Sequence, residues 1–304
     1  MKIGLFKGFA RGDGLVPAAW LLVFLLICPA LFGQTQSGGL KVTLEENNGG
    51  LTIISSQGTI KELVIPGTIN DMPVVAIGDG AFTKRGLTKV VIPDSVTTIG
   101  DLAFSNNEIS SLVIGNSVTS IGKKAFFSNK LETLSLGESL SEIGMGAFAE
   151  NNLTELVIPE KLESIGAYAF FFNKLRILSI PGTVTNLGEG AFSGNRLHTL
   201  VINSGVEQIG DGAFFNNRLI NITIPESVQN LGKRAFESRN TKSVEPPVDY
   251  LNEKGEILFT TATTFDAYYN ANGKKPGKYT FSKNGWALEE GSLEFIPKQF
   301  IFEK

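Results

Sequence analysis

The sequence contains one cysteine and one histidine in 304 residues. Structural and catalytic zinc sites need several cysteine, histidine or carboxylate ligands held together, and a serine hydrolase needs a histidine base beside its nucleophile. The only histidine, His198, has no cysteine or second histidine with which to form such a site. We therefore expect a protein that is not an enzyme and that uses no metal or other cofactor.

The single cysteine, Cys28, also excludes a disulfide within the chain, so stability must come from packing. Charge is balanced: 27 Lys and Arg oppose 30 Asp and Glu, for a net charge of −3. This mild acidity argues against nucleic acid as the main partner, because the phosphate backbone selects basic surfaces.

Residues 1–33 have the pattern of an export signal peptide. Lys2, Lys7 and Arg11 precede an apolar run over residues 15–32, and cleavage is expected before Gln34. Removal of three basic residues and one acidic residue moves the net charge from −3 to −5. The sequence thus predicts a protein that is secreted or displayed at the cell surface.

Two alternatives stay open for this segment. The apolar run approaches the ~20 residues that span a bilayer, so it is also consistent with a retained membrane anchor. A lipoprotein acylated at Cys28 is the third interpretation, although Ile27 is bulky where a small residue is preferred. A periplasmic location is the alternative to display at the cell surface.

The rest of the chain is organised around a 22-residue repeat. Its clearest mark is an Ala-Phe pair that recurs at a constant step, with the phenylalanines at Phe82, Phe104, Phe126, Phe148, Phe170, Phe192, Phe214 and Phe236. A glycine precedes each pair, and an asparagine follows most of them, at Asn107, Asn129, Asn151, Asn173, Asn195 and Asn217. A fixed period of this length, with an L-x-x-L-x-I core, is typical of leucine-rich repeats.

One such unit cannot bury its own apolar side, so neighbouring coils must bury each other. In residues 89–92 the alternation places Val90 and Ile92 inward and Lys89 and Val91 outward, as in a half-buried strand. We predict a β-rich solenoid of 22-residue coils with short parallel strands and an internal column of phenylalanines. The asparagine column is expected to satisfy backbone groups of neighbouring coils.

The repeat resembles that of the BspA-like, or treponemal-type, leucine-rich repeat family. The family unit L-x-x-I-x-I-P-x-S-V-x-x-I-G-x-x-A-F is matched by LTKVVIPDSVTTIGDLAF from Leu87 and by LINITIPESVQNLGKRAF from Leu219. Asparagine stands where the family often has cysteine, and the unit is one residue shorter than usual. The resemblance implies an exported bacterial protein, and several members are regarded as adhesins that bind host matrix proteins or other cells.

Domain boundaries follow from where the repeat begins and ends. Residues 34–59 are predicted to form a hairpin that caps the first coil, because terminal repeats must shield an apolar edge. Residues 60–246 form the solenoid of eight coils and a partial ninth. Residues 247–304, with turn-forming pairs at Asn272-Gly273 and Asn284-Gly285, are predicted to be a small β-hairpin module.

Candidate binding residues are the variable outward positions of the strands. Two columns run along them: Lys89, Ser111, Thr133, Glu155, Ile177, Thr199 and Asn221, and then Val91, Val113, Ser135, Val157, Ser179, Val201 and Thr223. A basic row precedes the strands, at Lys130, Lys174, Arg196 and Arg218. An acidic row follows them, at Asp94, Glu138, Glu160 and Glu226. Charged edges of opposite sign are expected to orient a polar protein partner, although they also suit a merely solvated surface.

The sequence therefore predicts a non-enzymatic scaffold that binds a host matrix protein or other cell-surface protein through the solenoid. The alternative is a structural protein of the envelope without an external ligand. A further open point is the set Phe127, Phe171, Phe172 and Phe215, which either forms an exposed aromatic stripe or fills space between coils. Oligomeric state is not readable from these patterns.

Overall fold

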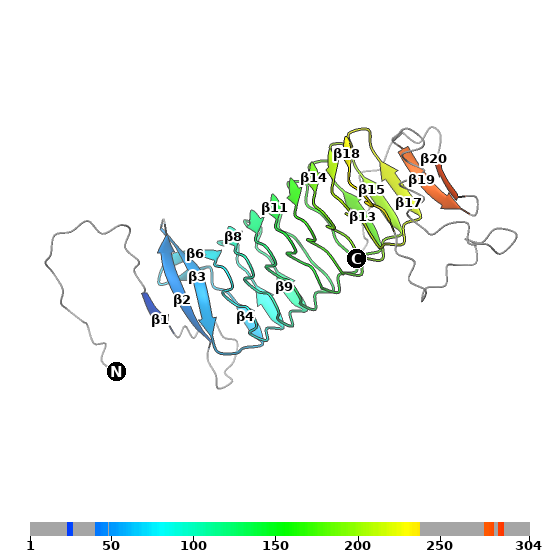
Figure 1. Ribbon diagram of the computed structural model, residues 1–304. Coiled ribbons are helices and arrows are strands. Elements are labelled where there is room, and N and C mark those ends of the chain that lie inside the picture. Colours follow the sequence, from blue (N-terminus) through cyan, green and yellow to red (C-terminus); the bar gives the residue numbers. More distant parts are fainter. Residues whose placement is uncertain (1–22, 27–39, 48, 238–276, 283–284, 289–304) are drawn as a thin grey trace, which may run out of the picture.

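The computed structural model describes residues 23–26, 40–47, 49–237, 277–282 and 285–288. They form an elongated stack of coils that runs from a hairpin near residue 50 to strands near residue 280 (Figure 1). Strands and turns make up this described part, and it contains no helix long and apolar enough to cross a membrane. We number the coils 1 to 8 by their Ala-Phe phenylalanine, from Phe82 to Phe236.

The strands form three sheets, of which the longest follows one side of the whole stack. This long sheet has 12 strands: β1 (Val23–Leu26), β2 (Lys41–Asn47), β3 (Gly50–Gln57), β6 (Met72–Ile77), β8 (Thr98–Ile99), β10 (Ser120–Ile121), β11 (Glu142–Ile143), β12 (Ser164–Ile165), β14 (Asn186–Leu187), β16 (Gln208–Ile209) and β18 (Asn230–Leu231), with β5 (Thr68–Ile69) paired to β6. From β6 to β18 all neighbours are parallel and one coil apart.

The predicted outward strands form the other two sheets. The three-stranded sheet holds β4 (Glu62–Val64), β7 (Lys89–Val91) and β9 (Ser111–Val113); the five-stranded sheet holds β13 (Ile177–Ile180), β15 (Thr199–Ile202), β17 (Asn221–Ile224), β19 (Gly277–Ser282) and β20 (Gly285–Leu288). Neither coil 4 (residues 131–136) nor coil 5 (residues 153–158) has a regular strand at this position. The prediction of a strand in every coil therefore does not hold for coils 4 and 5 on this side of the stack. We call this side the strand face.

A hairpin covers the first coil, as predicted. Its strands β2 and β3 are antiparallel, and Asn47 pairs with Gly50 at the turn. β3 then pairs in parallel with β6, so the hairpin extends the long sheet by one layer beyond coil 1. β1, the only described part of the predicted signal peptide, pairs with the other edge of β2. The five-residue insertion of coil 1 forms the β5–β6 hairpin, with Asn70 and Asp71 both at positive φ.

The phenylalanine column forms the centre of the core. Its eight rings are at most 1% exposed, and successive rings are stacked at centroid distances of 5.1–5.6 Å. Interplanar angles of 2–8° and these distances are those of offset-stacked aromatic pairs. The backbone beside the rings is bonded from coil to coil as well, for example from Phe104 N to Ala125 O at 2.8 Å.

The asparagine column satisfies the backbone of three segments at once. In coil 4, Oδ1 of Asn151 accepts from Leu131 N at 3.1 Å. Its Nδ2 donates to Phe126 O in the preceding coil and to Phe148 O in its own coil, at 3.0 and 3.2 Å. The same pattern recurs from Asn107 to Asn217, so the turns stay buried without unpaired amides. The predicted role of this column is confirmed.

The glycine column holds neighbouring coils in direct backbone contact. Gly166 N donates to Ile143 O at 2.8 Å, and a Cβ at Gly166 would lie 2.7 Å from Gly144 C and from Met145 N. This contact follows directly after the short strands of the long sheet. It accounts for the regular pairing of that sheet, in contrast to the interrupted strand face.

Replacing Gly166 with alanine is expected to lower the free energy of unfolding by about 1–3 kcal/mol, because the new methyl group meets backbone that cannot rotate away. Urea unfolding monitored by circular dichroism measures the change. Gly67→Ala is the matched control, since a Cβ there meets only Ser95 Oγ, at 3.7 Å. Equal midpoints for the two variants would show that coil contact at this column is not limiting.

At the far end the solenoid continues into a β-hairpin. β19 pairs antiparallel with β17, with Tyr279 opposite Ile222, and β20 pairs with β19. The expected hairpin is therefore present and covers the edge of the last outward strand. Other tail residues named above, including the pair Asn272-Gly273 and the partial ninth coil, lie outside the described residues, as does Cys28.

Candidate functional site

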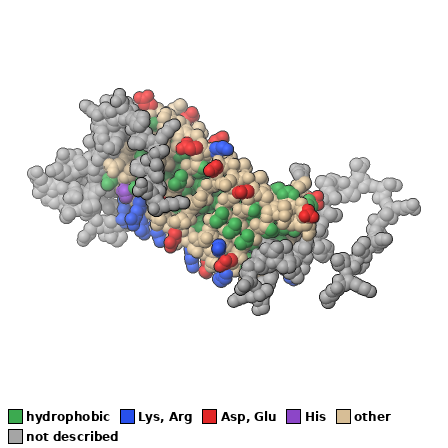
Figure 2. Space-filling view, turned by 180° about the vertical axis from the view of Figure 1, so that it is seen from behind, with side chains coloured by type: hydrophobic (Ala, Val, Ile, Leu, Met, Phe, Trp, Pro, Cys, Tyr) green, Lys and Arg blue, Asp and Glu red, His purple; other side chains and the backbone are tan. Residues whose placement is uncertain are grey.

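The strand face lies between two charged edges. Figure 2 shows Lys and Arg side chains gathered most densely on one edge beside the single histidine; Asp and Glu side chains also occur along that edge, and they predominate on the other. Hydrophobic side chains lie between these edges. All four members of the acidic row are exposed, as are three of the four members of the basic row, and Lys174 is half-buried.

The predicted binding residues differ in exposure along the stack. The exposed ones are Lys89, Ser111, Val113, Lys130, Thr133, Ser135, Glu155, Val157, Arg196 and Arg218. The half-buried ones are Val91, Lys174, Ile177, Ser179, Thr199, Asn221 and Thr223. The outward strand positions are therefore most open in coils 2 to 5 and less open in coils 6 to 8.

One predicted binding position is nearly buried. Val201 is only 9% exposed, although it occupies the same column as Val157, which is 65% exposed. Val201 lies in the regular part of the five-stranded sheet, paired on both sides with Ser179 and Thr223. Val157 lies in coil 5, which has no regular strand at this position.

Four valines lie in one outward column on the open part of the strand face, interrupted by Ser135 in coil 4. Val64, Val91 and Val113 are register partners on β4, β7 and β9, and Val157 follows two coils later. Val64 is 48% and Val113 51% exposed. The 22-residue period does not find Val64, because the insertion in coil 1 places it 27 residues before Val91. We call these four residues the valine stripe.

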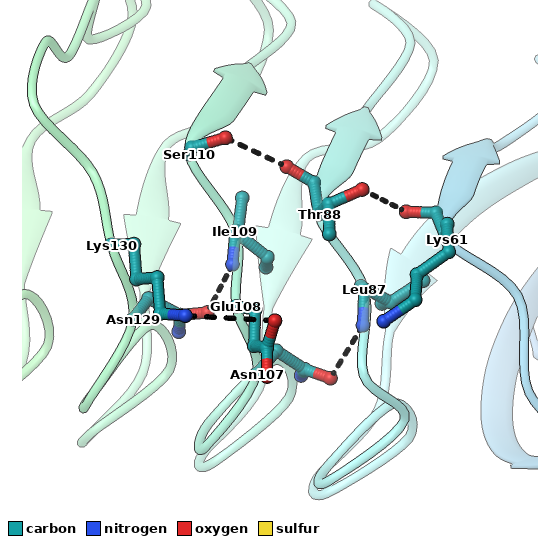
Figure 3. Close-up of polar contacts among 9 residues, drawn as sticks. All are labelled: Lys61, Leu87, Thr88, Asn107, Glu108, Ile109, Ser110, Asn129 and Lys130. Atoms are coloured by element: carbon teal, nitrogen blue, oxygen red, sulfur yellow. Dashed lines mark hydrogen bonds and ion pairs between the residues drawn. The ribbon is translucent and has the colours of Figure 1, made fainter.

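Charged residues beside the stripe are paired in the first coils. Lys89 Nζ lies 4.0 Å from a Glu62 carboxylate oxygen, and Lys130 Nζ lies 3.5 Å from a Glu108 oxygen. Figure 3 shows the second pair, and shows that side chains at this edge are also bonded from coil to coil, as from Thr88 Oγ1 to Lys61 O at 2.9 Å. In coils 2 and 3 the basic edge is thus partly neutralised.

Two positions in the turn of coil 5 carry bulky residues in an unusual backbone conformation. Tyr168 and Phe172 have φ of 58° and 52°, where most coils have glycine, lysine or a small polar residue. Their rings lie over the next coil at Gly190 and Gly194, which leave room for them. A hydrogen bond from Tyr168 to Glu189 raises the pKa of the phenol.

The aromatic residues in these turns divide into two groups. Phe127, Phe171 and Phe215 are half-buried and fill space between coils, whereas Phe172 is 54% exposed. Lys124 lies over the ring of Phe127 and Arg234 over that of Phe215. The continuous aromatic stripe is therefore absent, and Phe172 is its one exposed member.

The residues of an enzyme site do not come together in the described part of the chain. His198 is half-buried and lies beside Thr199, with Nδ1 and Oγ1 3.1 Å apart. Among the described residues there is also no cluster of three histidine, cysteine or carboxylate groups suited to a metal ion.

Comparison with known families identifies the repeat. Residues 75–198 and 164–287 match the model of the BspA-type leucine-rich repeat region, in six copies. The chain belongs to the BspA-type leucine-rich repeat family. Proteins of this family are repeat scaffolds, generally without catalytic activity and typically involved in binding proteins at surfaces. The fold implied by the sequence resemblance is thus confirmed.

Solved structures of bacterial leucine-rich repeat proteins are similar to this BspA-type chain. A leucine-rich repeat protein of T. pallidum is 25% identical with a TM-score of 0.48, and the match covers 53% of this chain and 82% of that one. A leucine-rich cell surface protein of Faecalibacterium prausnitzii is 23% identical with a TM-score of 0.41, over 67% of this chain and 74% of that one. No curated protein matches the chain.

Proposed function

We propose that this protein is an exported, non-enzymatic scaffold that binds another protein through the strand face. The observation that carries the proposal is the valine stripe, with Val113 and Val157 both more than half exposed. Exposed apolar side chains grouped on a soluble surface mark places where another molecule binds. The partner is a host matrix protein or another cell-surface protein, and the role is that of a surface adhesin.

The arrangement of the strand face has the composition of a protein interface. Binding surfaces combine an apolar centre with a polar rim, and the centre supplies most of the affinity. Here the valines are β-branched and restricted in rotamer, so little side-chain entropy is lost on binding. The Lys89–Glu62 pair and the charged rows supply the rim.

The predicted signal peptide supports export, and the family supports protein binding. One similar structure is that of a protein described as a cell surface protein. A role inside the envelope without an external ligand remains the competing function. Protection of the protein from added protease on intact cells would favour that role.

Replacing Val113 and Val157 together with glutamate is expected to weaken binding to the protein partner by about tenfold or more, because two desolvated contacts become buried charges. The measurement is binding of the full-length chain to a panel of immobilised matrix proteins and to whole cells. Surface plasmon resonance over a salt series gives the affinity and its dependence on charge.

The matched control is Leu102→Glu with Met145→Glu. These side chains are 43% and 41% exposed and lie on the turns away from the strand face, and the control introduces the same charge. Binding that survives the control but not the valine variant supports the proposal. No saturable binding by the parent chain, or equal loss in both variants, would reject protein binding by the valine stripe.

A further inference from the structure

Four lysine and arginine side chains and the single histidine gather on one edge of coils 5 to 7. Lys174, Arg196 and Arg218 occupy the same position in three successive coils, and Arg176 and His198 lie two residues beyond the first two of them. Coil-to-coil bonds fix the row: Arg196 N donates to Leu175 O at 3.0 Å, and Arg218 N to Leu197 O at 2.8 Å. We call these five residues the cationic patch. It is the dense group of Lys and Arg beside the histidine in Figure 2.

No described residue forms an ion pair with the cationic patch. Within the described residues the ion pairs are Lys89–Glu62, Lys130–Glu108 and Arg234–Glu237, and none includes a member of the patch. Arg176, Arg196 and Arg218 are exposed. Lysine and arginine side chains grouped without an ion pair among the described residues create a local positive potential that attracts an anion. Arg176 was not among the residues singled out from the sequence.

The spacing of the patch defines the shape of its ligand. Adjacent coils are 5.2–5.6 Å apart at their phenylalanine rings, and parallel strands are generally ~4.8 Å apart. The row therefore presents one cation per coil along a straight line, at a repeat of about 5 Å. An extended peptide presents side chains of one face only every ~6.6 Å, a longer repeat than that of the row. A duplex nucleic acid presents its phosphates on a curved path that leaves a straight row.

An exposed aromatic residue stands just before the row in the chain. Phe172 precedes Lys174 by two residues, on the other side of the buried Asn173, and its ring packs 3.5 Å from the Cβ position of Gly194. The ring thus lies over coil 6, two residues before Arg196. Its exposure of 54% and its φ of 52° make it costly as a purely structural residue. A flat apolar ring beside cations suits the C–H face of a sugar that carries an acidic group.

We propose that the cationic patch and Phe172 bind a linear acidic polysaccharide, one with a carboxylate or sulfate group on successive sugars. Lysine and arginine contact the acidic groups, one coil to each, and Phe172 packs against a sugar ring. A polymer with an acidic group on every sugar carries negative charge at a spacing comparable to that of the coils, so several basic side chains contact it at once. This site is separate from the valine stripe, and the inference goes beyond the proposed function.

The test is binding of the full-length chain to polygalacturonate and to dextran sulfate, by isothermal titration calorimetry at several salt concentrations. Uncharged dextran, polyglutamate and a single-stranded oligonucleotide are measured beside them. Both acidic polysaccharides are expected to bind, with an affinity that falls as salt rises, and uncharged dextran is not. Arg196→Glu with Arg218→Glu is expected to weaken binding by about tenfold or more.

Two further variants distinguish binding at this site from attraction by the overall charge of the protein. Lys123→Glu with Lys161→Glu makes the same change in net charge at exposed positions elsewhere and is expected to leave the affinity unchanged. Phe172→Ala is expected to weaken polysaccharide binding while the salt dependence stays the same. Equal loss in both charge-reversed variants would overturn the proposal, as would binding of polyglutamate or the oligonucleotide at least as tightly as the polysaccharides.

The outcome is independent of protein binding. Val113→Glu with Val157→Glu is expected to retain polysaccharide binding, since the valine stripe lies in coils 1 to 5 of the strand face. Unfolding midpoints of the arginine variants are expected to match the parent, because no described ion pair is lost. A lower midpoint together with lost binding would assign the arginines to stability instead.

Discussion

Phe148→Ala is expected to lower the free energy of unfolding by about 3–5 kcal/mol, the usual cost of removing a fully buried phenylalanine. The ring is 0% exposed and is stacked between Phe126 and Phe170, at 5.3 and 5.4 Å. Its removal leaves a cavity that the neighbouring coils cannot close, because their backbones are already in contact at the glycine column. Urea unfolding followed by circular dichroism measures the loss.

The control for this variant is Phe172→Ala, the same substitution at an exposed ring in the next coil. It retains the strained backbone and loses mainly an edge contact with Phe171, at a 4.4 Å centroid distance, so a change of about 1 kcal/mol is expected. A repeat array can unfold in parts, so coincident fluorescence and circular dichroism transitions are required before free energies are compared. If Phe148→Ala costs no more than Phe172→Ala, the phenylalanine column is not the main source of stability.

Asn151→Ala is expected to destabilise the protein by about 3–5 kcal/mol, although it removes little apolar surface. The side chain is buried and bonds to Leu131 N, Phe126 O and Phe148 O. Each backbone group left unpaired in the interior costs about 1–3 kcal/mol, and alanine leaves at least two without their side-chain partner. The measurement is again the urea midpoint and its slope.

Asn152→Ala is the matched control at the adjacent position. Asn152 is half-buried, and within the described residues only its backbone is bonded, from N to Leu131 O at 2.8 Å. We expect this change to lower the free energy of unfolding by less than about 0.5 kcal/mol. Similar losses of unfolding free energy in the two variants would mean that water replaces the hydrogen bonds of Asn151. The asparagine column would then contribute little to stability.

The repeated features of the fold were predictable because each is a consequence of the period. Every coil places the same residue type at the same place, so burial of Phe104 implies burial of Phe126 and its successors. The hairpin around Asn47 and Gly50 was predictable from its turn residues. The candidate surface was predictable only as columns, since periodicity shows which side chains point outward but not how exposed each one is.

Features that depend on contacts between coils were not predictable. The sequence does not show that coils 4 and 5 lack regular outward strands, nor that Val201 is buried while Val157 is open. Val64 could not be assigned to the outward column from the 22-residue period, because of the insertion in coil 1. The positive φ of Tyr168 and Phe172 was also hidden, since bulky residues seldom take a conformation that favours glycine.

By itself the sequence determined the solenoid, its family and the identity of its core columns, because a 22-residue period allows only one way for the coils to bury each other. The tertiary structure decided which of the outward residues form surfaces. It joined Val64 to the valine stripe through strand pairing across the insertion. It also decided exposure within the basic row, where Arg196 and Arg218 are exposed and Lys174 is half-buried, because exposure depends on packing against neighbouring coils.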